Sequence, residues 1–234
     1  VFLRIPRRAW CSACRPYCPA PASRDLLRRG DADMRWLACL VFCLSLSGCF
    51  SSGKRGGDSP LAVYDFGPAA ASLRAVPRKQ PVALEVRAPL WFDSQGIDYR
   101  LAYEDVARLR EYARARWAGP PVQLIQQRLI QQLGLSMAGQ SQARCLLRIE
   151  ITEFSQVFAT ANESRGVLQG RVVLLDRSRQ QQAELSLNLE KPAPSPDARG
   201  GVTALTGAVD QLAADLANWE KKLLKSGNAS GCFG

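Results

Sequence analysis

The chain has 234 residues, 31 Lys and Arg against 21 Asp and Glu, a formal net charge of +10, eight cysteines and no histidine. The absence of histidine excludes Ser-His-Asp and Cys-His catalysis and histidine-ligated metal sites. Residues 1–48 hold 8 basic and 3 acidic side chains, so the remainder carries 23 − 18 = +5 and half of the positive excess lies near the start.

A short apolar segment follows the first methionine, Met34. One arginine precedes an apolar core at residues 36–46, which is too short to cross a bilayer core of roughly 30 Å. Ser47 and Gly48 then lead to Cys49, a pattern typical of a lipoprotein signal peptide at 34–48. We predict cleavage before Cys49 and acylation of its thiol, which anchors the chain because each buried acyl CH₂ contributes about 0.8 kcal/mol. The alternative is a buried helix that ends in an ordinary cysteine.

Residues 1–33 precede that methionine, and we interpret them as an over-extended gene start that belongs to no folded domain. Their cysteines Cys11, Cys14 and Cys18 have a spacing that can bind metal. Without histidine or a second CxxC pair, we predict no metal site and no cofactor other than the acyl chains on Cys49.

The first part of the exported chain reads as a tether and several strands. Residues 49–60 are polar and glycine-rich, which predicts a flexible linker. Residues 61–68, 81–89 and 97–103 show the alternation or the turn signals of strands. The segment 106–119 fits either a helix or one face of a strand, and both interpretations stay open.

The next element is a helix that begins at Pro120-Pro121, since proline is tolerated in the first helical turn, and ends at Gly134. Its predicted apolar face consists of Val122, Ile125, Leu129 and Leu133. Glutamine and arginine side chains fill the opposite face. Three strands are then predicted in 145–154, 166–176 and 183–190, and the polar run 177–182 forms a hairpin loop between the last two.

The last helix follows a proline-rich break at 191–201. Its apolar residues recur at spacings of three and four: Val202, Leu205, Val209, Leu212, Leu216, Trp219 and Leu223. This spacing suits a coiled coil or packing on the domain's own sheet, and we favour the sheet because there are only three heptads and Gly207 lies inside. Together these elements predict an α+β fold in which two helices pack on a mainly antiparallel sheet. We predict a single domain over 61–226, followed by a flexible tail at 227–234.

Two cysteines remain beyond the signal peptide and Cys49. Cys145 opens a strand pattern, whereas Cys232 lies in the glycine-rich tail. An oxidising periplasm permits a disulfide between them. Because the pattern does not place them near each other, we predict two free thiols.

No catalytic arrangement is apparent in the sequence. Residues 134–139 resemble a nucleophile elbow, but the second glycine comes one place too late and no base exists. Glu150, Glu153 and Asp176 occupy strand positions with no acid–base pairing. We therefore predict that the protein is not an enzyme.

The segment 99–121 combines basic and aromatic residues. Four arginines interleave with two aromatic side chains, namely Arg108, Arg110, Arg114, Arg116, Tyr112 and Trp117. One interpretation is a solvated basic face with the aromatics turned into the core. The other is a contact surface for a partner or anionic lipid, since arginine and aromatic residues are enriched at interface anchors. The candidate partner-binding residues are Arg110, Tyr112, Arg114, Arg116 and Trp117.

The lipobox-like start, together with "YDFGP", "VRAPLWFDSQGIDYRLAY", "YARARWAGPPVQLIQQRL" and "LLRIEITEFSQVFATANESRGVLQGRVVLLD", resembles the ABC-type transport auxiliary (PqiC-like) lipoproteins. The resemblance extends from about Val63 to Leu224 and is most specific at 112–121. It implies an outer-membrane-anchored periplasmic lipoprotein without catalytic residues. The implied partners are an MCE-domain periplasmic protein, an ABC permease and its ATPase, which together move phospholipids or related molecules between membranes.

Phe50 follows the acylated cysteine where aspartate would signal inner-membrane retention in enteric bacteria, which favours the outer membrane of a Gram-negative cell. An exported domain meets anionic lipid or acidic proteins rather than nucleic acid. Three hypotheses follow: a structural adaptor for the MCE assembly, a phospholipid carrier with its own cavity, or an envelope-assembly lipoprotein unrelated to transport.

Overall fold

The computed structural model describes residues 60–68, 71–74, 80–92, 94–139, 142–227 and 230–233. Contacts within the chain separate two units, Val1–Gly57 and Asp58–Gly234, and every described residue belongs to the second. The predictions for residues 1–33, the signal peptide at 34–48, Cys49 and most of the tether therefore lie outside the described residues.

The described ranges hold an eight-stranded sheet and several helices. In chain order these are β1 (Ala62–Tyr64), β2 (Val82–Arg87), the short 3-10 helix η1 (Leu90–Phe92), β3 (Gly96–Leu101), β4 (Asp105–Trp117), α2 (Pro121–Leu133), β5 (Ser136–Met137), β6 (Cys145–Phe158), β7 (Ser164–Leu175), β8 (Gln181–Pro192), α3 (Ala198–Ser226) and α4 (Ser230–Phe233). Apart from η1, β5 and α4, which the pattern did not reveal, each lies where a strand, a helix or the ambiguous segment was expected.

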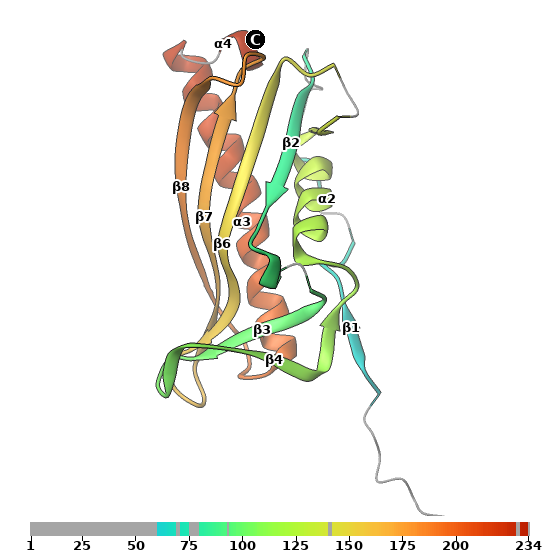
Figure 1. The fold of residues 1–234 in the computed structure, drawn as a ribbon, viewed down its shortest axis with the longest axis vertical. Helices are drawn as coiled ribbons and strands as arrows, with labels where there is room; N and C mark the ends of the chain where they lie inside the picture. The colour runs from blue at the N-terminus through green and yellow to red at the C-terminus, as the bar shows by residue number, and fades with distance from the viewer. Residues whose placement is uncertain are drawn as a thin grey trace, which may run out of the picture. The chain divides into compact units, whose positions relative to one another are not determined.

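Strand β6 organises the sheet (Figure 1). Strand β7 pairs with it antiparallel along most of its length, and β8 pairs antiparallel with β7. On the other edge of β6, β2 pairs in parallel with its first residues and β3 with its last. Because the longest pairings are antiparallel, the predicted α+β fold with a mainly antiparallel sheet is confirmed.

Helix α3 packs along one face of β6, β7 and β8 (Figure 1). Its apolar stripe is buried there: Val202, Leu205, Val209, Leu212, Leu216 and Leu223. Each fully buried side chain of this kind contributes roughly 1.5–3 kcal/mol, so the stripe determines which way the helix faces. The prediction that this helix packs on its own sheet is confirmed.

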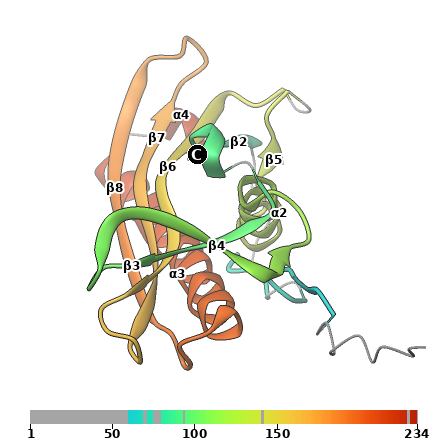
Figure 2. The same ribbon diagram turned by 60° about the horizontal axis from the view of Figure 1, so that its bottom comes forward.

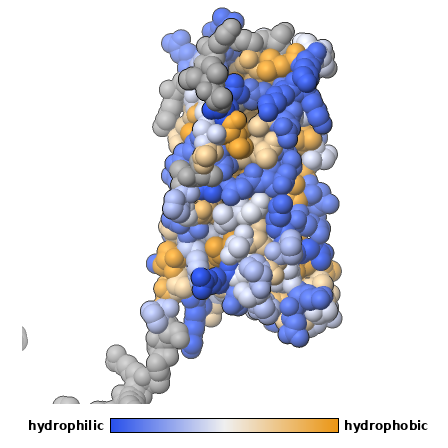
Figure 3. Space-filling view, turned by 180° about the vertical axis from the view of Figure 1, so that it is seen from behind, coloured by the Kyte–Doolittle hydropathy of each residue, from blue (hydrophilic) through white to orange (hydrophobic). Residues whose placement is uncertain are grey.

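Two glycines let α3 approach the sheet closely. A Cβ on Gly166 of β7 would lie 2.7 Å from the backbone nitrogen of Leu205, and one on Gly201 would overlap the side-chain amide of Gln156. A side chain at Gly166 would therefore push the helix away from the sheet, and one at Gly201 would displace Gln156. The surface on this side of the domain is mostly hydrophilic with scattered hydrophobic patches (Figure 3). Among the described helices, none has the length and apolarity needed to cross a membrane.

Helix α2 ends as predicted at Gly134, which adopts a left-handed conformation with φ of 59°. Two of the Arg and Gln side chains that the sequence places opposite the apolar face are buried. Arg128 donates to both carboxylate oxygens of Asp210 on α3 (2.9 and 3.1 Å), and Gln132 donates to the first of these at 2.8 Å. Because α2 packs against α3 as well as β2, these polar side chains are buried between the helices.

The ambiguous segment 106–119 forms most of strand β4 rather than a helix. Its backbone pairs antiparallel with β3 and, at its end, in parallel with β1. Tertiary pairing decides between the two patterns, since local periodicity supported both.

Cys145 and Cys232 form a disulfide, with their Cα atoms 5.4 Å apart, so the prediction of two free thiols is wrong. The fold brings the start of β6 next to α4, across a sequence separation of 87 residues. Local sequence carries no signal for such a long-range approach. Part of the predicted flexible tail is thus fastened to the sheet.

Candidate partner-contact surface on strand β4

Strand β4 lies at an outer position of the sheet. The ribbon formed by β3 and β4 crosses the end of the sheet made by β6, β7 and β8 (Figure 2). On the side away from β3, strand β1 covers β4 at Ala115–Trp117, and among the described residues no strand pairs with that edge over 105–114. Unpaired backbone groups along an edge can receive an extended segment of another chain.

Three arginines of this strand are exposed, and we call them the β4 arginine surface: Arg108, Arg114 and Arg116. None of them forms an ion pair with another residue of the part of the chain that the structure describes. Arg110 differs, because it is half-buried and its guanidinium bonds to the Glu104 carboxylate. The exposed arginines are therefore the candidates for attracting an acidic or anionic partner.

Tyr112 is half-buried and does not belong to this exposed surface. Its ring lies 4.6 Å from that of Tyr99, and its hydroxyl donates to Oε1 of the buried Gln156 at 2.9 Å. Burial, followed by the nearby Tyr99 and Asp197, raises the pKa of Tyr112 above its usual value, so the hydroxyl stays a neutral donor. Its contacts attach β4 to β3 and β6.

Trp117 is buried, with 1% of its surface exposed. Its ring makes an edge contact with Phe66 at 5.4 Å and lies 6.0 Å from Phe154. The interpretation of Trp117 as a partner-binding side chain is therefore corrected, and it is a core residue. The parallel pairing of β1 with the end of β4 encloses this ring, a long-range contact that the sequence pattern does not reveal.

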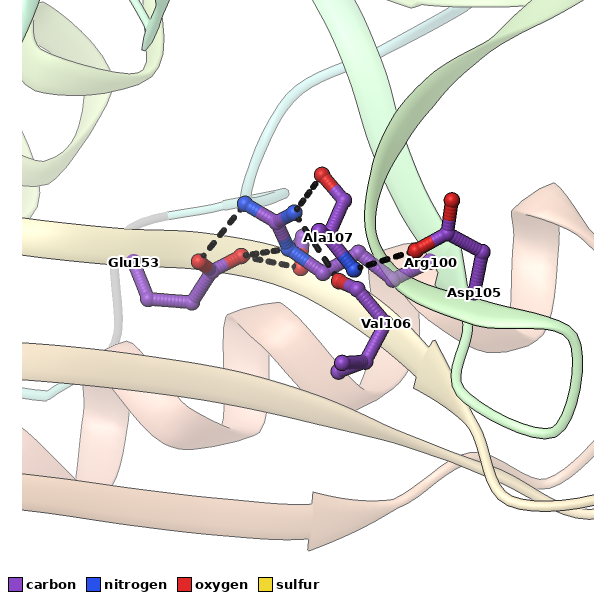
Figure 4. Close-up of polar contacts among 6 residues, drawn as sticks. Arg100, Asp105, Val106, Ala107 and Glu153 are labelled. Atoms are coloured by element: carbon purple, nitrogen blue, oxygen red, sulfur yellow. Dashed lines mark hydrogen bonds and ion pairs between the residues drawn. The ribbon is translucent and has the colours of Figure 1, made fainter.

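Arg100 on β3 is a positioning residue that the sequence did not single out. Its guanidinium forms two hydrogen bonds with Glu153 on β6 (3.1 and 3.0 Å) and donates to the backbone oxygens of Val106 and Ala107 at 3.2 Å (Figure 4). The first residues of β4 are thus attached to strand β6. Only the fold brings these residues together, so no sequence motif could have identified them.

Asp98 and Glu111 lie directly opposite each other on β3 and β4. Asp98 is 8% exposed. Burial, with further contributions from Glu111 and Glu153 and an opposing one from Arg100, raises the pKa of Asp98 from 3.8 to about 7. Two carboxyl groups that face each other in a partly buried place disfavour ionisation. Asp98 therefore keeps its proton at pH values at which an exposed aspartate is already ionised.

We expect Asp98→Asn to stabilise the domain at pH 8 by about 2 kcal/mol and to change little at pH 4. The pKa of Asp98 is higher in the folded state than in the unfolded chain. The protonated carboxyl therefore contributes its full stability below about pH 4, and this contribution is lost as the pH rises through about 7. The amide cannot ionise and removes that loss. Thermal melts at several pH values measure the effect, with Glu163→Gln, an exposed carboxyl in the β6–β7 turn, as the control. Equal melting shifts at pH 4 and pH 8 would contradict the assignment.

The three carboxylates that the sequence analysis weighed as candidates for acid–base chemistry have structural contacts. Glu150 pairs with Arg171, Glu153 with Arg100, and Asp176 accepts from the backbone of Gln180. Within the described ranges, no group of three or more Cys, Asp or Glu side chains is arranged to hold a metal ion.

The family of the ABC-type transport auxiliary lipoprotein component matches residues 64–217, which span the sheet from the end of β1 through most of α3. The chain belongs to this family. The match covers most of the folded domain, so the resemblance inferred from the sequence motifs is confirmed. Among curated proteins, no sequence matches this chain significantly.

Solved structures share the fold of this auxiliary lipoprotein domain. A DUF330 protein, XCC0632 from Xanthomonas campestris, is 17% identical with a TM-score of 0.57, covering 68% of this chain and 94% of its own. An uncharacterised protein of 14% identity has a TM-score of 0.54 and covers 68% of this chain and 97% of its own. At these identities the similarity shows the fold alone.

Proposed function

We propose that this auxiliary lipoprotein is a non-catalytic adaptor, anchored by acyl chains on Cys49 at the periplasmic face of the outer membrane. In this role it docks the MCE-domain protein of an ABC-type lipid transport system, which also contains the permease and the ATPase. The family match over the folded domain is the observation that carries the proposal.

The disulfide supports an exported location. Cys145 and Cys232 are joined, and such bonds persist in oxidising compartments such as the bacterial periplasm. The lipobox-like residues before Cys49 independently favour export and acylation. Both features support export of the folded domain, which a component linking two membranes requires.

The surface of the domain favours an adaptor over a carrier. Two cavities lined by described residues have volumes of about 160 and 220 Å³, below the roughly 300–1,000 Å³ of typical ligand pockets. They are too small to enclose a whole phospholipid. The β4 edge over 108–114, with which no described strand pairs, and the β4 arginine surface instead offer backbone and charge to a protein segment.

Affinity purification of the full-length protein from its native envelope tests the proposal. We expect the MCE-domain protein to co-purify with the wild type, and Arg114→Glu combined with Arg116→Glu to reduce its recovery at least about tenfold, equivalent to about 1.4 kcal/mol. Labelled palmitate should enter the wild type but not Cys49→Ala. The matched control is Lys221→Glu with Lys222→Glu, two exposed cations on α3.

The possible failures are distinguishable. If no MCE-domain protein co-purifies with the wild type, the adaptor role is wrong. If it does, and both charge-reversed variants recover it equally, the role stands but the β4 arginine surface is not the contact. Equal palmitate labelling of Cys49→Ala would contradict the anchor.

A further inference from the structure

A small cavity lies at the end of the sheet nearest the C-terminus, where β2 and β6 begin and β7 ends (Figure 1). Its volume is about 220 Å³. Small and apolar residues line part of it, together with the disulfide-bonded Cys145: Ala83, Ala138, Gly139, Ala143 and Leu146. The rest of the lining is polar and comes from the start of β6 and the β7–β8 turn.

Three arginines line this cavity, and we call them the cavity arginines: Arg144, Arg177 and Arg179. Arg144 immediately precedes β6, whereas the other two belong to the turn between β7 and β8. All three are exposed, and within the described residues none of them has a carboxylate partner. Two segments more than 30 residues apart thus bring three positive charges to one concave site.

One carboxylate, Asp176, also lines the cavity and balances at most one of the three positive charges. Asp176 accepts a hydrogen bond from the backbone nitrogen of Gln180 at 2.9 Å and another from the side-chain amide of Gln182 at 2.8 Å. Its two oxygens are therefore engaged in shaping the turn that presents Arg177 and Arg179. The cavity keeps an excess of positive charge, which favours an anion.

We propose that this cavity binds a phosphate group. Guanidinium groups match the geometry of phosphate oxygens with paired hydrogen bonds, and three of them around one concavity can surround a single phosphate. A volume of about 220 Å³ admits a glycerol-phosphate-sized group. The apolar part of the lining, which includes Ala83 and Leu146, suits the carbon atoms of such a group. The source is a phospholipid headgroup or a free phosphorylated solute, since both present the same chemistry.

This site is separate from the proposed partner contact. It lies at the opposite end of β6 from the β3–β4 ribbon (Figure 1), and none of its lining residues belongs to β4. Phosphate binding can therefore be measured on the full-length protein in uncharged detergent, without the MCE-domain protein. A failure to bind phosphate would leave the adaptor role untouched. A failure to bind the MCE-domain protein would likewise leave the phosphate site untouched.

Isothermal titration calorimetry with two probes tests the proposal. The first, sn-glycerol 3-phosphate, represents a free solute, and the second, dihexanoylphosphatidylglycerol below its micelle concentration, represents a lipid headgroup. We expect at least one probe to bind the wild type, and the triple variant Arg144→Gln, Arg177→Gln and Arg179→Gln to weaken that binding more than about tenfold. The control variant removes three other exposed cations from α3: Arg199→Gln, Lys221→Gln and Lys222→Gln.

Every result is decisive. Loss of binding in the cavity variant but not in the control supports the site, and the probe that binds identifies the source. Equal loss in both variants shows a response to net charge alone and overturns the proposal, as does absence of binding to the wild type. Circular dichroism melts verify that both variants stay folded, which we expect because all six side chains are exposed.

Discussion

Trp117→Ala is expected to destabilise the domain by about 3–5 kcal/mol, because it removes a large aromatic side chain from a closed part of the core. The Trp117 ring is 1% exposed and contacts Phe66 and Phe154, so its loss leaves a cavity that neighbouring rings cannot fill without moving. For a domain of this size the melting temperature should fall by roughly 6–20 °C. A thermal melt followed by circular dichroism measures it.

Trp91→Ala provides the matched control for that experiment. Trp91 belongs to η1, and 63% of its surface is exposed, so its truncation should change stability by less than about 0.5 kcal/mol. The comparison separates the burial of Trp117 from the general effect of losing an indole. Similar melting temperatures for the two variants would show that Trp117 is not the core residue described.

Removal of the disulfide is expected to destabilise the domain by about 2–5 kcal/mol, because the bond closes a loop of 87 residues in the unfolded chain. The double variant Cys145→Ala and Cys232→Ala measures this by thermal melt. Alanine is the suitable replacement because both sites are buried and a serine hydroxyl there would need a partner. Helix α4 has four residues and cannot persist alone, so it should detach in the variant.

Reductant supplies the control for the disulfide. Dithiothreitol should lower the melting temperature of the wild type to that of the double alanine variant and leave the variant unchanged. An effect on the variant would reveal another reducible bond. If reductant does not shift the wild type, the two cysteines are free thiols and the bond is absent.

Much of the fold could be predicted from the sequence because its determinants are local. The alternation of apolar side chains in β2, β6 and β8 reflects the two-residue period of a strand, although consecutive residues at the start of β2 and at both ends of β6 are buried on both faces. The spacing of three and four residues in α3 and the proline and glycine at the ends of α2 act within a few positions. The residues that carry the family resemblance could be read in the same way.

The candidate sites depended on contacts that no local pattern contains. The sequence fitted Trp117 both to the core and to an interface, and only the pairing of β1 with β4 decides for the core. No sequence pattern indicated a partner for Arg128, which bonds to Asp210 of α3. The same is true of the cavity arginines, which come from separate segments.

The sequence by itself determined the fold class, the order of the main elements, the family and the predicted lipid anchor, since each follows from short-range periodicity or a contiguous motif. Only the tertiary structure decided that 106–119 is a strand, that Cys145 bonds to Cys232, and which arginines remain exposed. The physical reason is that burial, charge pairing and disulfide formation depend on which distant segments meet. That choice is made by the packing of the whole domain rather than by the preference of any one segment.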